Sequence, residues 1–339
     1  MFIIKMFLLR TDYKRSMEDQ NQTAVTEFLF SGLTDHLHQQ ILLFVTLGFV
    51  YLVTLGGNLG MITLICMDPR LHTPMYFFIS HLSFVDMCSS SSIAPKVLCD
   101  IFAEKKGISF LGCAAQMWFL GLFVATECFL LASMAYDRYL AICKPLLYSQ
   151  IMSQRVCVQL VMGPYAVALM STMTHTTLTF CLLFCGPNVI NHFFCDVSPL
   201  LSLACAATSV INLVLFTLAG AVGVLSGLII MVSYVCILVA ILRLQSAGGR
   251  RKDFSTCSSH LAAVSILYGP LFFVYVRHGS GSSLDINEVV SLFYTVVTPM
   301  LNPLIYSLRN KEVKNAFGRT VERNFFLKKI DRILIDHRG

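Results

Sequence analysis

The sequence has few charged side chains, and this shortage excludes most classes of soluble protein. Only 13% of its 339 residues are Asp, Glu, Lys or Arg, whereas 56% are hydrophobic. Soluble domains carry about 25% charged residues, so this chain has too few charges to cover a globule in water. Disordered proteins, coiled coils and ordinary cytosolic enzymes are therefore excluded. The composition indicates an integral membrane protein.

The apolar part of the chain also lacks the features of several other membrane proteins. It has no matched halves of the kind that transporters with inverted repeats show, and no rings of charged residues for a channel. Residues 289–308 contain no lysine that could hold retinal. No His or Ser arrangement accompanies the few buried acids, so the sequence gives no reason to expect an enzyme.

Seven apolar stretches are present, and each is long enough to cross a bilayer. Five contain no charged residue, and two contain one acid each, Asp86 or Glu127. None alternates like a barrel strand, and backbone groups in lipid must be satisfied within a helix. The fold class is an all-α membrane protein, a seven-transmembrane helix bundle. Its spans are expected near residues 41–66, 76–99, 114–141, 156–181, 208–242, 255–276 and 288–308.

The distribution of Lys and Arg predicts the topology. Seventeen lie on one side, nine of them in the tail from Arg309 onward, and eight lie on the other. Positive charge is retained in the cytoplasm, so the N-terminus is expected outside and the C-terminus inside. The net charge of +6 then reflects topology and does not indicate nucleic-acid binding. The predicted domains are an extracellular tail, the bundle and a cytoplasmic tail, residues 1–40, 41–308 and 309–339.

The N-terminal tail contains an atypical extension, residues 1–16. Its apolar run is too short for a span and lacks the small-residue cleavage site of a signal peptide. Met17 offers a second start, and both starts stay open. Asn21 begins an Asn-Gln-Thr triplet, the acceptor pattern for N-glycosylation in an outside tail, so we expect a glycoprotein.

Four of the thirteen cysteines are expected on the oxidising side, where disulfides persist. They allow three pairings, and the sequence alone does not choose among them. The rival interpretation is a metal site at residues 192–195, but one His and one Cys fall short of four ligands. The four cysteines are Cys113, Cys185, Cys195 and Cys205.

Asp86 and Glu127 are the acids well inside predicted spans. Because an ionised group in lipid costs about 2.5–3.5 kcal/mol, both should face the interior of the bundle. They could hold a cation or a proton between them, or they could join Asn58 and Asn302 in a hydrogen-bonded polar core. The first interpretation is favoured, and the second remains open.

Two further features fit a helix bundle that changes conformation. At the inner end of the third span, Asp137 and Arg138 could form a local ion pair, although Arg138 could also simply reach the interface. Pro299 and Pro303 each remove a hydrogen bond from the seventh span and permit a bend. Polar residues beside such a bend suit a helix that moves.

Several motifs each stand at the expected place on a predicted span. They are residues 71–78, 82–86, 134–143, 233–234, 252–261 and 299–310. Together they resemble the motifs of the olfactory receptors of the rhodopsin-like G-protein-coupled receptor superfamily, and the resemblance runs from about residue 21 to residue 317. It implies a multi-pass protein of the plasma membrane, in olfactory cilia, that serves olfaction as a sensory transducer.

The resemblance also implies roles for individual residues. Disulfides would join Cys113 to Cys195 and Cys185 to Cys205. Asp86 and Glu127 match the acids of the family's sodium site, so an allosteric sodium ion is the one cofactor implied. Coupling to a stimulatory, olfactory-type G protein and a rise in cAMP are implied too. The residues implied in coupling and switching are Asp137, Arg138, Tyr139, Tyr234, Asn302, Pro303 and Tyr306.

The chain departs from the family pattern at three places, the first of which is the extension over residues 1–16. Asp253 replaces the usual alanine of the sixth-helix motif and could alter coupling through Lys252 or Arg251. The tail beyond residue 317 mixes apolar and basic residues over 324–334. Such a segment could form a short amphipathic helix on the lipid of the inner leaflet, or it could be disordered.

The implied ligand pocket lies between the outer halves of the third, fifth, sixth and seventh spans. Few polar groups and no charge are expected there, so a charged ligand would be costly to bury. We expect a small, neutral, largely apolar odorant. His175 and His192 near the outer face are interpreted as structural hydrogen-bonding residues. The residues expected to contact the ligand are Leu120, Gly121, Val124, Ala125, Leu218, Val222, Tyr268, Leu271, Phe272 and Tyr275.

The predicted function is that of an odorant receptor, with a small molecule, a heterotrimeric G protein and membrane lipid as partners and no nucleic acid. The alternative is a related seven-helix receptor for a non-odorant small molecule outside the nose. Both interpretations use the same pocket and the same coupling residues.

Overall fold

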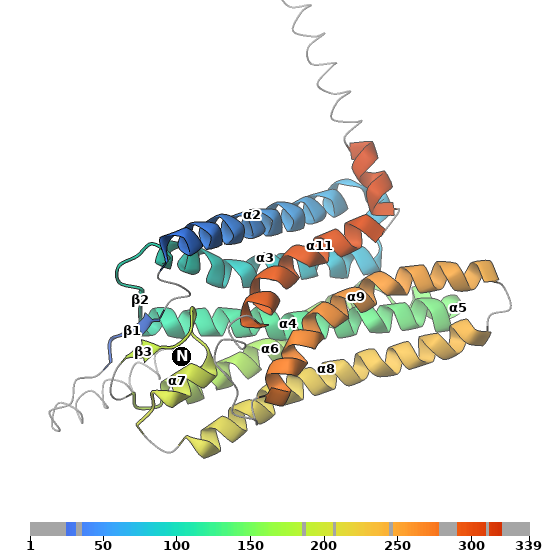
Figure 1. Cartoon of the computed structure of the whole chain (residues 1–339). Helices are drawn as coiled ribbons and strands as arrows, with labels where there is room; N and C mark the ends of the chain where they lie inside the picture. The colour runs from blue at the N-terminus through green and yellow to red at the C-terminus, as the bar shows by residue number, and fades with distance from the viewer. Residues whose placement is uncertain are drawn as a thin grey trace, which may run out of the picture.

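The computed structural model describes residues 25–31, 36–184, 188–205, 208–243, 247–277, 290–309 and 312–320. Long helices run alongside one another through most of this length (Figure 1). The first six predicted spans each lie almost wholly in one of them, whereas the seventh, 288–308, is divided between a π-helical turn and α11. Helices α2, α4, α6 and α8 are apolar and long enough to cross a membrane. The helices are α2 Leu37–Met67, α3 Pro74–Asp100, α4 Phe110–Cys143, α6 Gln154–Phe180, α8 Ser209–Arg243, α9 Ala247–Arg277 and α11 Thr298–Arg309.

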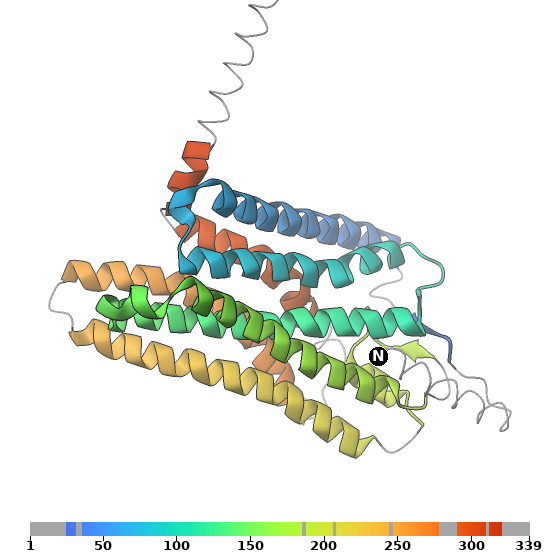
Figure 2. The ribbon, with the colours of Figure 1, turned by 180° about the vertical axis from the view of Figure 1, so that it is seen from behind.

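Helix α4 runs through the middle of the bundle. It contacts α3, α6, α8 and α9, and Figure 2 shows it between α3 on one side and α8 on the other. Its buried residues, such as Leu130, Leu131 and Met134, recur at helical spacing and so face several neighbours at once. Leu52 of α2 and Val232 of α8 are instead exposed, at 69% and 61%. An apolar outer surface suits helices that are solvated by lipid.

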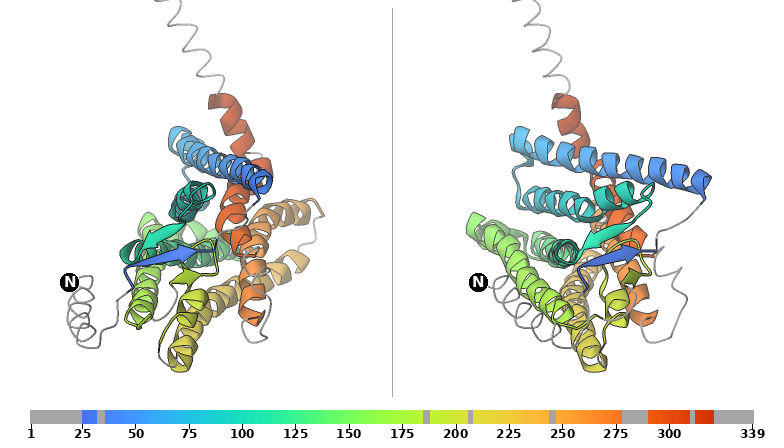
Figure 3. Two further views of the ribbon diagram at one scale, coloured as in Figure 1. Left: turned by 60° about the vertical axis from the view of Figure 1, so that its left-hand side comes forward. Right: turned by 90° about the vertical axis from the view of Figure 1, so that its left-hand side faces the viewer.

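A small sheet covers one end of the bundle, which we call the sheet end. Its strands are β1 Glu27–Phe30, β2 Gly107–Ser109 and β3 Val189–Ile190, and β1 lies in the middle. β1 pairs antiparallel with β2 and parallel with β3, and Figure 3 shows the strands across the helix ends. Part of the predicted N-terminal tail is therefore an ordered strand.

An aromatic cluster fixes this sheet on the helices. Phe28 of β1 is fully buried and stacks on Phe110 at 6.0 Å between ring centroids. Phe184 meets Phe28 edge to face at 5.4 Å, and Phe180 meets Phe110 at 5.1 Å. Such aromatic pairs stabilise beyond the area that they bury, so the sheet is anchored to α4 and α6.

The seventh helix is irregular near its prolines. A π-helical turn, Phe293–Val297, precedes α11. Pro303 has no backbone N–H, so the carbonyl of Pro299 loses its helical donor. Asn58 of α2 donates to that carbonyl at 2.9 Å and replaces the missing bond. Gly57 allows this close approach, because a Cβ there would stand 3.2 Å from Pro303 Cγ.

Short elements complete the fold. They are the 3₁₀ turn Pro69–Leu71, α5 Pro145–Ile151, α7 Val197–Ser202 and a helix over residues 312–320. That last helix lies within the predicted tail, at the end of the bundle opposite the sheet, which we call the tail end. The segment 324–334, the Asn21 acceptor site and the extension 1–16 lie outside the described residues.

Candidate functional site: a cavity and its links to the tail end

A cavity of 460 Å³ lies in the half of the bundle nearer the sheet. Residues of α4, α6, α8 and α9 line it, together with Tyr294 of the π-helical turn and the segment 195–198. Most of the lining is apolar. Cavities of this size and composition are typical of small-molecule sites.

The lining includes most of the residues that the sequence places there. Leu218 lies on α8 but does not line the cavity. The side chain of Tyr275 is outside the described part of the chain. The predicted residues that line the cavity are Leu120, Gly121, Val124, Ala125, Val222, Tyr268, Leu271 and Phe272.

Sequence reasoning missed one wall of the cavity. Ser171, Thr172 and His175 of α6 line it, although the predicted pocket left the fourth span out. Asp196 lines it too, so the expectation that no charge is present is wrong. The loop residue reaches the cavity because it follows Cys195, whose disulfide to Cys113 holds the loop on α4.

His175 joins two helices beside the cavity. Its ring nitrogens lie 2.9 Å from the carbonyl of Ser171 and 3.0 Å from the carbonyl of Leu215 on α8. Both neighbours are acceptors, so an N–H on either ring nitrogen has a backbone carbonyl to donate to. His175 is thus a structural residue, as its sequence context favoured.

Tyr268 stands where the cavity meets the interior of the bundle. Its hydroxyl donates to Ser226 Oγ of α8 at 2.7 Å, and Ser226 donates to the carbonyl of Val222. Ser226 is fully buried. A ligand that touches Tyr268 therefore touches a side chain that ties α9 to α8.

Below the cavity, one amide bridges the two buried acids. Nδ2 of Asn302 donates to Asp86 Oδ2 at 3.0 Å and to Glu127 Oε1 at 3.1 Å. The carboxyl groups are almost completely buried, and buried charges need compensation. Since one amide cannot neutralise two carboxylates, a proton or a cation must supply the rest. Asn302 Oδ1 is also buried without a hydrogen-bond partner.

Near the tail end, Asp137 does not pair with its neighbour. The ion pairs of the described residues do not include Asp137–Arg138, because adjacent helical side chains point in different directions. Asp137 instead accepts from Tyr148 of α5 at 2.7 Å. Burial and this carboxylate raise the pKa of Tyr148, so its hydroxyl stays protonated and donates.

His260, which the sequence did not single out, links three helices beside Arg138. One ring nitrogen lies 3.0 Å from the carbonyl of Leu131 on α4, and the other lies 2.8 Å from the hydroxyl of Tyr234 on α8. Arg138 Nε and the Tyr306 hydroxyl are buried without partners. Unpaired buried polar groups cost free energy, so these two gain from any movement that gives them partners.

The loop cysteines agree with part of the implied pattern. The structure contains the Cys113–Cys195 disulfide. Cys205 is disulfide-bonded, and its expected partner Cys185 lies outside the described residues. His192 was expected to hydrogen-bond, but both of its ring nitrogens are buried without partners. Burial lowers the pKa of His192, so the ring is held neutral.

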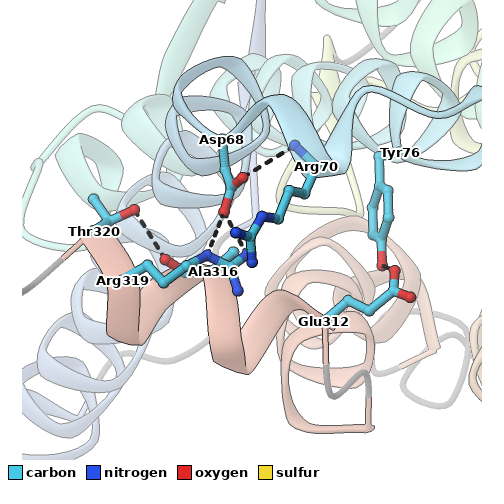
Figure 4. Close-up of polar contacts among 7 residues, drawn as sticks. All are labelled: Asp68, Arg70, Tyr76, Glu312, Ala316, Arg319 and Thr320. Carbon is cyan, nitrogen blue, oxygen red and sulfur yellow. Dashed lines mark hydrogen bonds and ion pairs between the residues drawn. The ribbon is translucent and has the colours of Figure 1, made fainter.

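The tail-end helix 312–320 is docked by two polar contacts (Figure 4). Arg319 donates to Asp68 Oδ2, and the backbone N–H of Arg70 donates to Oδ1 at 3.0 Å. The hydroxyl of Tyr76 on α3 donates to Glu312 at 2.8 Å. Hydrogen bonds from Arg319 and Arg70 lower the pKa of Asp68. The side chains of Lys252 and Asp253 lie outside the described part.

The sequence matches known proteins over most of its length. The profile of the olfactory receptor family matches residues 47–324. Human (Homo sapiens) olfactory receptor 5G3 is 74% identical over 311 residues, which are 92% of this chain and 99% of that protein. Olfactory receptor 5G29 of Mus musculus is 74% identical over 310 residues, 91% and 99% of the two chains. Olfactory receptor 5G25 of Mus musculus is 67% identical over 318 residues, 94% and 100%.

Proposed function

The chain belongs to the olfactory receptor family, and we propose that it binds an odorant in the 460 Å³ cavity and activates a stimulatory, olfactory-type G protein. Members of this family are seven-helix, multi-pass receptors of the plasma membrane and are not enzymes. The cavity is the observation that carries the proposal, because it lies against residues that connect to the opposite end of the bundle.

The ligand is a small, neutral, largely apolar molecule. Its main support is the lining, in which Leu120, Val124, Leu271 and Phe272 are typical. An unpaired charge buried against such side chains loses more free energy of hydration than it gains from contacts with them. The sheet end, with the cavity, faces outside, and the tail end faces the cytoplasm.

Two links carry the signal from the cavity to the tail end. A ligand displaces Tyr268 from Ser226 and frees α9 from α8. Movement of α9 then breaks the His260 bridge to α4 and Tyr234. Tyr234, Tyr306 and Arg138 change partners, and Arg138 meets the G protein, which raises cAMP through adenylyl cyclase.

Asp86, Glu127 and Asn302 hold a sodium ion in the resting receptor. The ion supplies positive charge that compensates the two carboxylates. These residues fit a hard cation because they offer oxygen ligands, including the unpartnered Asn302 Oδ1. Asn302 bridges α3, α4 and α11, so the site stabilises one arrangement of the three helices.

The test is cAMP in cells that express the chain with an olfactory-type G protein, measured against a panel of neutral odorants. Arg138→Ala is the signalling control, and the surface amount of both proteins is measured. We expect a dose-dependent rise in cAMP that the variant loses. The proposal would be contradicted by a well-expressed receptor that gives no cAMP response to any odorant, and whose cAMP level does not rise when substitutions at His260 release α9 from its neighbours.

A further inference from the structure

Asp196 is placed in the cavity by covalent structure. It directly follows Cys195, which is joined to Cys113 of α4 and is fully buried. The backbone N–H of Cys195 also donates to Oε1 of the buried Gln116 at 3.0 Å. These contacts hold the start of segment 195–198 firmly against α4. Asp196 is therefore held in place as part of the cavity wall.

One oxygen of this carboxyl group is available to a ligand. Oδ1 accepts from the backbone N–H of Val197 at 2.8 Å. Oδ2 has no hydrogen-bond partner among the described residues, and Asp196 forms no ion pair there. His192 interacts with it electrostatically, but the nitrogens of that ring make no hydrogen bond. An ionised carboxylate only accepts hydrogen bonds.

Most other polar side chains of the lining already have partners. Asn212 is one of them, and Tyr294 hydrogen-bonds to Ser291 and interacts electrostatically with Asp196. His175 lies against two carbonyls, Thr172 donates to the carbonyl of Ala168, and Tyr268 donates to Ser226. The hydroxyls of Ser171 and Ser198 also line the cavity. A hydroxyl can donate as well as accept, so either serine can form a second hydrogen bond with a ligand group that is bound to Asp196.

We propose that Asp196 anchors the ligand and that the receptor selects apolar alcohols and phenols. The inference rests on the proposed function, since it names the ligand class of the same cavity. The hydroxyl donates to Asp196 Oδ2, its oxygen accepts from Ser171 or Ser198, and the hydrocarbon part packs on the apolar lining. Ketones, aldehydes, esters and ethers only accept, so they leave the carboxylate unpaired and bind more weakly.

An amine is a poorer occupant than an alcohol. A protonated amine has three N–H donors, whereas the lining offers it one unpartnered carboxylate oxygen and two serines, Ser171 and Ser198. Its charge must also lose its water of hydration in an otherwise apolar cavity, which is costly. A hydroxyl has one donor, and one oxygen satisfies it. A carboxylic acid is excluded when ionised because it would face another carboxylate.

The experiment compares compounds that share a carbon skeleton. Octanol, octanal, octanoic acid and octylamine form one set, and benzyl alcohol, benzaldehyde, benzoic acid and benzylamine form another. Each is measured by cAMP and by the shift in unfolding temperature of purified receptor. Within each set that binds, we expect the alcohol to give the largest shift in unfolding temperature and the largest cAMP response. The unfolding measurement detects binding independently of signalling. A receptor that binds the alcohols but raises no cAMP would therefore contradict the proposed signalling function and leave the proposed ligand class intact.

Asp196→Asn tests the anchor directly. The amide still accepts, so binding of the best alcohol should weaken about tenfold, as for the loss of a hydrogen bond to a charged group. The amide N–H can also donate, so the aldehyde should gain relative to the alcohol. A change of this ratio is not a consequence of misfolding. Glu104→Gln, at an exposed acid away from the cavity, is the matched control and should change neither value.

Three results would overturn the inference. The first is binding in which alcohols have no advantage over aldehydes. The second is an alcohol-to-aldehyde ratio that Asp196→Asn and Glu104→Gln leave equally unchanged. The third is tighter binding of octylamine or benzylamine than of the alcohols, which would make Asp196 the counter-ion of a cation.

Discussion

At the scale of single residues, Asn302 has the largest polar role, because its one amide serves two buried acids. Asn302→Leu removes this donor and leaves both carboxyl groups without it. Since an unsatisfied buried group costs about 1–3 kcal/mol, we expect a clear loss of thermal stability. The measurement is the unfolding temperature of purified receptor.

The compensating variant is Asp86→Asn in the Asn302→Leu background. Removing one acid halves the charge that must be compensated, so part of the lost stability should return. If the double variant is no more stable than Asn302→Leu alone, the shared amide is not what holds this site.

His192 predicts a dependence of stability on pH. Burial holds the pKa of the folded ring below its ordinary value of about 6.5, so the unfolded chain takes up a proton first as the pH falls. Stability is therefore retained above about pH 6.5 and declines below it, until the lowered folded pKa is reached. His192→Leu should reduce the decline between pH 7.5 and pH 5.5, measured as unfolding temperature. His72→Gln, at an exposed histidine, should not.

Single residues were predictable where a span or a family motif fixed them. Leu120, Gly121, Val124 and Ala125 share one face of α4, and that face meets the cavity. Asp196 was not predictable in this way. Its place depends on the path of a loop, and the sequence alone left three cysteine pairings for that loop.

At the scale of elements, the contact of α2 with the seventh helix depends on Gly57. A Cβ there would stand 3.2 Å from Pro303 Cγ, tighter than an ordinary contact. Gly57→Val should therefore push α2 away, disturb the Asn58 bond to Pro299 and destabilise the receptor by about 1–3 kcal/mol. Gly56→Val is the matched control, because nothing lies within 4 Å of a Cβ at that position. Equal unfolding temperatures for the two variants would contradict this account.

The tail-end helix 312–320 gives a second prediction at this scale. Arg319→Glu places two acids together at the Asp68 contact, so the helix should detach from the loop. Adding Asp68→Arg restores opposite charges and should redock it. A spin label or fluorophore pair across the contact measures the separation. A helix that stays docked in Arg319→Glu would show that Tyr76 and Glu312 suffice.

Helix bounds were predictable because lipid sets the length of a span, and each of the first six predicted spans lies almost wholly in one helix. Irregular elements were not. The strand Glu27–Phe30 is only four residues long and forms by pairing with distant loops. The π-helical turn Phe293–Val297 has no local pattern, although Pro299 and Pro303 marked a break nearby.

At the scale of the whole molecule, the polar interior and apolar exterior follow from composition. Few charges are present, and the two acids in the middle of the bundle, Asp86 and Glu127, share one bridging amide. The sheet end is closed by a disulfide and aromatic contacts, so a ligand site there is rigid. Links through Tyr268 and His260 join it to the tail end.

The central claim is that a ligand in the cavity drives this coupling, and filling the cavity tests it most directly. Gly223 lines the cavity, and a Cβ there meets nothing within 4 Å, so the leucine side chain of Gly223→Leu should extend into the space that the ligand would occupy. Gly163→Leu is the control, since Gly163 is exposed on α6 and equally open. With equal surface expression, the odorant-evoked cAMP response should be lost or shifted at least tenfold in Gly223→Leu and kept in Gly163→Leu. Identical responses from the two variants would contradict the account.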